Sequence, residues 1–380
     1  MRPLLRAEQA VLGALLFAPG QLDRLAQWLR PEHFYRPQHA ALYAAMLHLR
    51  QNKPAAALPA ADGDRVEWIS ATLAEAGTHT RGLFPAYAHA LISACPDPRN
   101  APVYGRMVLE GAIHRTVTEH ATRLHQAARA DLLRGESEET LRQVDILTEV
   151  LADLARQWGT RPATTAASTN AAPAAVCERH RADEQLLLAT LIDRPDSLDS
   201  VVRWLRPEDF ADRGHGQLYR CLAALHHRGE PIDPLTVLWE AQRRGLLAQG
   251  VLTADQVDGI TRGLGAGDAD YVAEALLQTS LIRTAASAAR SIQAAAGDDA
   301  LPPGRLISEA IGALDAVAAV RQRWREATAA SPPPDSVGPE ADTRARAQAA
   351  KARGTTPSQQ AGHGHPTAKH NPSAAVRARR

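Results

Sequence analysis

The chain has 380 residues, of which 45% are hydrophobic, 22% charged and 4% aromatic, and its formal net charge is +1. This is enough for roughly two or three packed domains and is too apolar for a wholly disordered protein. No apolar stretch approaches the roughly 18 residues that a membrane-spanning helix needs, so we expect no integral membrane protein. The three cysteines lie far apart, which predicts neither disulfides nor a zinc site and favours a reducing, cytoplasmic location.

The most informative feature is an internal repeat with a spacing of 176 residues. It needs no gap for about forty residues, a length that chance does not produce. A period this long, with a change of composition between the copies, indicates two tandem domains rather than a solenoid. The matching segments are Glu8-Gln9 with Glu184-Gln185, Trp28–Glu32 with Trp204–Glu208, His39 with His215, and Leu42-Tyr43 with Leu218-Tyr219.

Each copy begins with short amphipathic helices, because its apolar residues recur at helical spacing. In the first copy the spacing predicts helices over 11–16, over 22–29 and over 42–49, and the second ends where Arg30 precedes Pro31. The second copy adds a turn from Pro231 that leads into a helix to Arg244, closed by Gly245.

Longer helical periods follow in each copy. Residues 103–128 and 138–158 predict a helical hairpin that is broken near Gly135, and residues 271–296 and 307–324 predict a second one. Strand signals are scarce. We therefore expect an all-α fold of two tandem helical domains, each a small globular head plus a long helical hairpin.

Composition sets the domain limits at 1–158 for copy 1 and 179–326 for copy 2. Residues 159–178 predict a flexible linker that spans about 25 Å on average. Residues 327–380 predict a disordered basic tail, with eight Lys or Arg against three acidic residues. The tail carries +5, which leaves −4 on residues 1–326, so any nucleic-acid affinity is expected in the tail.

Two segments of each copy carry a family resemblance. These are A-E-Q-A-V-L-G-A-L-L with L-R-P-E-H-F-Y-R-P-Q-H-A-A-L-Y, and E-Q-L-L-L-A-T-L-I with L-R-P-E-D-F and G-E-P-I-D-P-L-T-V. They resemble the N-terminal domain of DnaB-type replicative helicases. The resemblance implies a helical head and a hairpin, and in that family such domains pair through their hairpins into a collar that recruits primase and loader proteins.

Two departures accompany the likeness. Residues 55–64 have lost the D-P-x-T-V stretch, and Ala211-Asp212-Arg213 replaces the Tyr-Arg-Pro of residues 35–37. A motor of this family also needs a P-loop that ends in Gly-Lys-Ser/Thr. None of the three lysines, Lys53, Lys351 and Lys369, has such neighbours. We therefore expect no ATP-driven unwinding by this chain alone, no enzyme activity and no cofactor.

The remaining chemical candidates have structural explanations. His39 and His215 are expected to be hydrogen-bonded beside a helix start, rather than catalytic. Glu32 and Glu208 are expected to cap or charge a turn, and Trp28 and Trp204 to be core residues. His363, His365 and His370 lack an acidic or Cys partner, so no metal site is predicted, and no catalytic residues are assigned.

The leading hypothesis is a non-catalytic, replication-associated interaction protein that docks on a replicative helicase, a primase or itself. The hairpin seams, with Leu151 and Leu314, are the candidate partner-binding residues, unless these leucines are used in closing each hairpin. The linker also allows the two copies to pair within one chain. The alternative is a DNA-associated protein that binds nonspecifically through tail residues Arg344, Arg346, Lys351, Arg353, Arg377, Arg379 and Arg380. The sequence leaves open the partner, the oligomeric state and the effect on replication.

Overall fold

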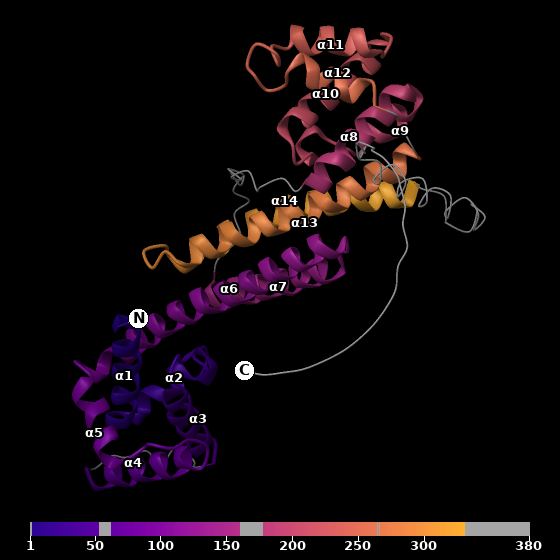
Figure 1. Ribbon diagram of the computed structural model, residues 1–380. Helices are drawn as coiled ribbons and strands as arrows, with labels where there is room; N and C mark the ends of the chain where they lie inside the picture. The colour runs from indigo at the N-terminus through magenta and orange to yellow at the C-terminus, as the bar shows by residue number, and fades with distance from the viewer. Residues whose placement is uncertain (1, 53–61, 160–177, 264, 266, 331–380) are drawn as a thin grey trace, which may run out of the picture. The chain divides into compact units, whose positions relative to one another are not determined.

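The computed structural model describes residues 2–52, 62–159, 178–263, 265 and 267–330, and the regular secondary structure of this part of the chain is helical, without strands. Nearly all of the expected linker and of the basic tail lies outside the described residues. None of the described helices is long and apolar enough to cross a membrane. Each copy has a head of short helices that leads into a long hairpin, as predicted (Figure 1).

In copy 1 the head contains α1–α5 and the hairpin α6 and α7. The bounds are α1 Arg2–Phe17, α2 Leu22–Leu25, α3 Pro37–Asn52, α4 Asp62–Gly77, α5 Pro85–Ala94, α6 Ala101–Arg134 and α7 Glu138–Trp158. In copy 2 the head contains α8–α12 and the hairpin α13 and α14. The bounds are α8 Glu178–Asp193, α9 Leu198–Val201, α10 Arg213–Arg228, α11 Pro234–Arg243, α12 Ala254–Thr261, α13 Ala269–Ala296 and α14 Pro303–Ala330.

The helix between residues 22 and 29 is shorter than its periodicity predicts. The chain forms a 3-10 turn over Pro19–Gln21, then one turn of α2, and it leaves the helix after Leu25. Leu29 is nevertheless buried, and its carbonyl accepts a hydrogen bond from the Tyr43 hydroxyl at 3.2 Å. Copy 2 repeats this contact between Tyr219 and the Leu205 carbonyl at 3.3 Å. Tertiary contacts therefore replace the helix that the apolar spacing alone favours.

Helix ends follow local chemistry. Gly135 ends α6 with a φ of 77°, a left-handed conformation that glycine adopts without strain. The turn to α7 is tied by the buried Asp131 carboxylate, which accepts from the backbone N–H and the hydroxyl of Thr140, both at 2.8 Å. In copy 2, α14 runs to Ala330, four residues past the predicted domain limit, because Ala327 is still buried in the core.

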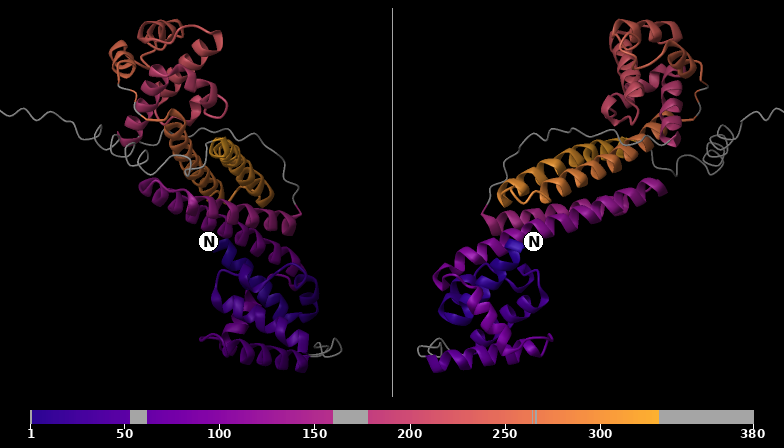
Figure 2. Two further views of the ribbon diagram at one scale, coloured as in Figure 1. Left: turned by 90° about the vertical axis from the view of Figure 1, so that its right-hand side faces the viewer. Right: turned by 60° about the vertical axis from the view of Figure 1, so that its left-hand side comes forward.

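The two hairpins pack against each other and share one core. Helix α6 lies along α13, and α14 lies against α7, as the views in Figures 1 and 2 agree. A single cluster of buried side chains contains residues of both hairpins, such as Leu124 and Leu147 from copy 1 and Leu281 and Val317 from copy 2. The four long helices thus form an intramolecular bundle, which is the pairing within one chain that the sequence allowed.

Candidate interaction site

Helices α6 and α13, which are in contact, each bury small side chains. Ala121 and Ala128 of α6 and Ala285 and Ala289 of α13 are all fully buried. Alanine keeps high helix propensity while it removes bulk from the contact, so two long helices can lie backbone to backbone. Both first hairpin helices thus carry small buried residues that suit a close pairing of helices.

Polar contacts fix the register between the paired hairpins. The His114 ring contacts two copy 2 carbonyls, with Nδ1 at 2.9 Å from the Ala296 oxygen and Nε2 at 3.0 Å from the Leu301 oxygen. The Arg321 guanidinium forms a two-pronged ion pair with Asp145. Two amide-to-hydroxyl bonds also cross the interface, Gln278 to Ser137 at 3.1 Å and Gln293 to Thr122 at 2.9 Å. Directional contacts of this kind oppose sliding of one hairpin along the other.

Leu151 and Leu314, the partner-binding candidates from the sequence, lie inside this bundle. Leu151 is fully buried and Leu314 is 5% exposed, and both belong to the shared core cluster. They close the hairpins against each other in this conformation. A partner reaches them only if the bundle opens, so their partner-binding role stays a prediction.

Each head is fastened by a buried carboxylate and imidazole. In copy 1 the Glu8 carboxylate accepts from the backbone N–H groups of Tyr35 and Arg36 and from His39 Nδ1–H, the last at 2.6 Å. Both side chains are fully buried. The clasp joins α1 to the start of α3, which confirms that His39 is hydrogen-bonded beside a helix start.

Copy 2 repeats the clasp with a 176-residue shift. Glu184 accepts from the backbone N–H groups of Ala211 and Asp212 and from His215 Nδ1–H at 2.7 Å. A signal for this pairing is present in the sequence, because both members of the pair recur together in the two copies. The position of His39 and His215 alone does not reveal the pairing, which is visible only when Glu8 and Glu184 are aligned with them.

The turn after L-R-P-E is closed by a residue other than the expected glutamate. In copy 1 the Arg30 backbone N–H donates to His33 Nδ1 at 3.1 Å, and in copy 2 the Arg206 N–H donates to Asp209 Oδ2 at 2.7 Å. Glu208 instead pairs with Arg220 at the surface. The capping role expected for Glu32 and Glu208 therefore belongs to the residue that follows each of them.

Asp209 also joins the copy 2 head to its hairpin. Its buried carboxylate accepts from Ser280 of α13 at 3.0 Å and from both terminal nitrogens of Arg323 on α14. The Arg323 guanidinium donates in addition to the Trp204 carbonyl at 3.0 Å. Trp204 is buried as expected, whereas Trp28 of copy 1 is only partly buried.

Burial of His33 in copy 1 disfavours the charged form of its imidazole. Burial holds the pKa of His33 below its ordinary value of 6.5, and the positive charges of Arg30 and Arg115 lower it further, against a raising effect from Glu32. A neutral ring also suits the geometry, because Nδ1 must be unprotonated to accept the Arg30 N–H. Copy 1 thus uses a neutral acceptor where copy 2 uses a charged one.

Acidification should therefore weaken copy 1 through His33. Because the folded-state pKa is lowered, the stability that His33 contributes is fully present above the unfolded value and is lost as the pH falls through the folded value. We expect the variant His33→Asn, whose amide oxygen still accepts but does not titrate, to lose less stability than the wild type between about pH 7 and about pH 5. Urea denaturation at both pH values measures this. The matched control is His79→Asn, a change at an exposed histidine that should lose as much stability as the wild type. If His33→Asn loses as much stability on acidification as this control, His33 is not the group that makes copy 1 sensitive to acid.

The remaining candidate residues from the sequence lie in the basic tail. The tail residues Arg344, Arg346, Lys351, Arg353, Arg377, Arg379 and Arg380, and the three tail histidines, lie outside the described residues. Within the described ranges no group of three or more His, Cys, Asp or Glu side chains could hold a metal ion.

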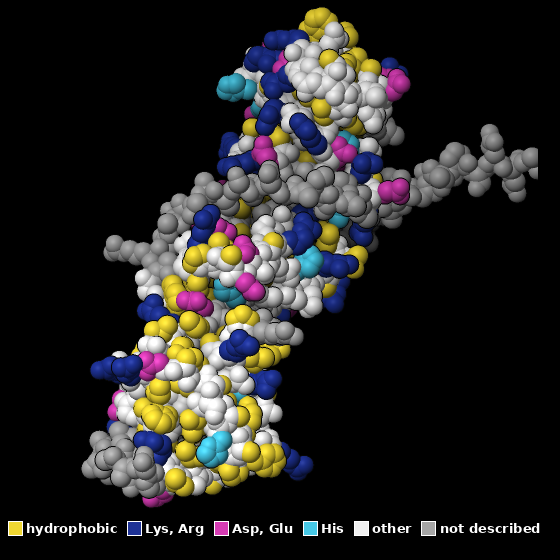
Figure 3. Space-filling model, turned by 90° about the vertical axis from the view of Figure 1, so that its left-hand side faces the viewer, with side chains coloured by type: hydrophobic (Ala, Val, Ile, Leu, Met, Phe, Trp, Pro, Cys, Tyr) yellow, Lys and Arg dark blue, Asp and Glu magenta, His cyan; other side chains and the backbone are white. Residues whose placement is uncertain are grey.

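The outer surface carries mixed charge and some apolar side chains. On the face in Figure 3, basic side chains gather on the upper head with a few acidic ones among them, and hydrophobic side chains cover much of the lower head. Helix α11 of copy 2 exposes two large apolar side chains one turn apart, Leu235 at 74% and Trp239 at 61%. Tryptophan is enriched among the residues that dominate protein interfaces, so Trp239 marks a candidate contact surface.

This architecture, a helical head and hairpin present twice, matches one known family. The family described as DnaB-like helicase N terminal domain matches residues 2–110 and 178–262, just over half of the chain. The chain belongs to this family and contains the domain twice. Its relationship to DNA replication follows from that membership, and the two matched ranges coincide with the two heads and the start of the first hairpin.

Replicative helicases are among its relatives. Replicative DNA helicase DnaB of Mycobacterium leprae is 35% identical over 123 residues, 32% of this chain and 19% of that protein. The DnaB of Leifsonia xyli is 31% identical over 124 residues, 32% of this chain and 25% of that protein. Replicative DNA helicase DnaC of Bacillus subtilis is 29% identical over 149 residues, 37% of this chain and 30% of that protein. The matches thus span less than a third of the length of each helicase.

Proposed function

We propose that this chain is a non-catalytic interaction protein of DNA replication that docks on a replicative helicase or a primase. The observation that carries the proposal is the pairing of two helicase-type N-terminal domains through their hairpins inside one chain. Such a unit needs no second copy to complete its core. Its outer surfaces are available to imitate, or to bind beside, the corresponding domains of a helicase.

The sequence supports the non-catalytic part of the proposal. Its three lysines have neighbours that do not fit a Gly-Lys-Ser/Thr motif, so the phosphate-binding chemistry of a helicase motor has no residues in this chain. We also propose a cytoplasmic location and two domains with the limits 1–158 and 179–326. Family membership supports the connection with replication, and the choice between helicase and primase is left to the binding experiment.

The docking proposal predicts a measurable complex. We expect the full chain to bind the purified helicase or primase of its own organism with a Kd on the order of 1 μM, as for transient signalling contacts. Biolayer interferometry measures this. A strict monomer in light scattering that retains neither protein contradicts the proposal.

The α11 surface gives the matched variants. Trp239→Ala should weaken the complex by about 10-fold or more if α11 is the contact. Trp239 is exposed in the free chain, and a tryptophan that a partner covers dominates the binding energy of an interface. Leu133→Ala, also exposed but on α6, is the control. Equal loss in both variants rules out α11 as the contact.

The second candidate function rests on the basic tail. Deleting residues 331–380, which follow α14 and carry +5, should abolish DNA binding together with its steep salt dependence. Fluorescence anisotropy with duplex DNA at several salt concentrations distinguishes the two functions. DNA binding that survives the deletion refutes a tail-based mechanism.

A further inference from the structure

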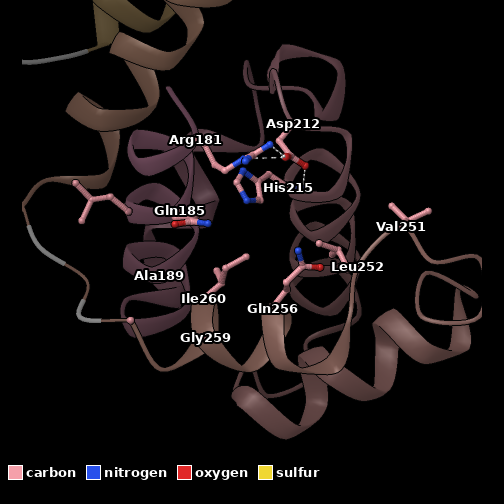
Figure 4. A pocket seen from close by; sticks show the side chains of 12 residues that line it. Arg181, Gln185, Ala189, Asp212, His215, Val251, Leu252, Gln256, Gly259 and Ile260 are labelled. Carbon is pink, nitrogen blue, oxygen red and sulfur yellow. Dashed lines mark hydrogen bonds and ion pairs between the residues drawn. The ribbon is translucent and has the colours of Figure 1, made fainter. Parts of the chain in front are cut away.

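The head of copy 2 contains a cavity that borders the buried clasp. It has a volume of about 520 Å³ and lies between α8, the start of α10 and α12 (Figure 4). His215 forms part of its wall, with Gln185 and Gln256 on either side of the opening below it. The ring is 3% exposed, and its Nδ1 is engaged by Glu184. No residue that the structure describes forms a hydrogen bond with Nε2 of His215.

Copy 1 fills the corresponding position with one of its own side chains. The Tyr87 hydroxyl of α5 lies 2.8 Å from His39 Nε2, and the two rings stack with centroids 6.2 Å apart. The Glu8 carboxylate accepts from His39 Nδ1–H on one side of the ring, and Nε2 on the other side faces the phenol hydroxyl of Tyr87. Copy 1 therefore shows which group satisfies this imidazole.

Helix α12 places a glutamine where α5 places Tyr87. Both residues follow their helix N-cap, Phe84 or Thr253, by three positions. The buried positions agree, since Ala88 and Leu91 in α5 correspond to Val257 and Ile260 in α12. The Gln256 carboxamide folds back and accepts the Thr253 N–H at 2.8 Å in a capping box, so it is held by its own helix.

A second substitution keeps the cavity open. At Gly13 of α1 an added Cβ would lie 2.1 Å from the Leu91 carbonyl oxygen, so α5 crosses α1 as closely as it does only because this residue is glycine. The equivalent residue in α8 is Ala189, which has that Cβ. Helix α12 cannot approach α8 as α5 approaches α1. Both the missing ring and the wider crossing therefore have a sequence cause.

We propose that this cavity binds a tyrosine side chain of a partner protein, whose hydroxyl donates to His215 Nε2. The volume lies within the range of ligand sites, and Leu186, Leu252 and Ile260 supply apolar contacts for the ring. Tyrosine is a frequent interface residue because it is rigid, largely apolar and ends in a hydroxyl. The inference rests on the proposed docking function and names the chemistry of one contact.

The probe is p-cresol, which is the tyrosine side chain alone. We titrate it into the full chain with ¹³C-labelled histidine and follow the imidazole signals by NMR, with His215→Asn to assign the resonance. The His215 signal should shift with a Kd on the order of 1 mM. Toluene, which lacks the hydroxyl, should bind about 2- to 10-fold more weakly because one hydrogen bond is lost. If the His215 signal does not shift when p-cresol is added, the proposal is overturned.

Two variants exchange the states of the copies. Gln256→Tyr supplies the missing phenol from α12 itself and should abolish the response of His215 to p-cresol. Tyr87→Ala empties the matching position in copy 1, so the His39 signal should begin to respond. The second variant keeps the test valid if the first fails to fold. A response of His215 that persists in folded Gln256→Tyr, or a His39 that stays silent in Tyr87→Ala, contradicts the proposal.

A further arm separates a protein side chain from a free phenol. N-acetyltyrosinamide, which carries a peptide bond on each side, should compete with p-cresol. Its exclusion shows that the cavity takes only small phenols and overturns a protein tyrosine as the occupant. A chain that takes up both probes but binds neither helicase nor primase contradicts the proposed function alone. A chain that binds one of them while His215 stays silent contradicts the cavity alone.

Discussion

Replacing Arg323 by alanine should destabilise copy 2 by about 3–5 kcal/mol, because it removes the guanidinium that forms an ion pair with the buried Asp209 carboxylate. The Arg323 side chain is 12% exposed and the Asp209 side chain 2%, so water cannot replace the lost charge. Ser280 and the Arg206 N–H remain as donors but are neutral. Urea denaturation followed by circular dichroism measures the loss.

The control for Arg323 is an ion pair at the surface. Arg156 and Asp153 are 72% and 61% exposed, and Arg156→Ala should change the free energy of unfolding by no more than about 0.5 kcal/mol. Removing both charges with Asp209→Asn and Arg323→Met should cost less than Arg323→Met alone. A cost for Arg323→Ala as small as that of the control contradicts a structural role for the pair.

Leu151→Ala should cost about 2–5 kcal/mol, the range for a large-to-small change in a closed core. Leu151 is fully buried between the hairpins, so truncation loses apolar burial and leaves a cavity. Leu133→Ala on α6, at 84% exposure, should stay within about 0.5 kcal/mol of the wild type in the same denaturation experiment.

The same variant decides what Leu151 does. Partner binding per folded molecule should be unchanged in Leu151→Ala, because the side chain faces the core. Loss of partner binding with unchanged stability supports the sequence-based assignment of Leu151 to a partner surface, and contradicts its structural role.

The helical architecture could be predicted because the same spacing of apolar residues occurs in both copies of the repeat. The heads and hairpins follow from apolar spacing that recurs in both copies. Helix ends were less predictable. The spacing places the first hairpin helix at 103–128, whereas α6 spans Ala101–Arg134, since its last turns depend on Ala127, Ala128 and the Asp131 clasp to Thr140.

The candidate sites depend on contacts that sequence spacing does not encode. Asp209 gave no signal, because copy 1 has His33 at that position and no repeat marks the pair with Arg323. The cavity beside His215 requires knowledge of how closely α12 crosses α8. That distance depends on one methyl group, the side chain of Ala189 at the position of Gly13. The spacing of apolar residues is the same with glycine or alanine there, so it does not predict the distance.

Fusion of the paired hairpins into one polypeptide frees them from symmetry. In a dimer of identical subunits every substitution occurs on both sides of the interface. Here each copy can change alone. His33 aligns with Asp209, and Gly13 aligns with Ala189. His114 of copy 1 contacts the Ala296 and Leu301 carbonyls of copy 2. One half can thus preserve the scaffold while the other acquires a new specificity.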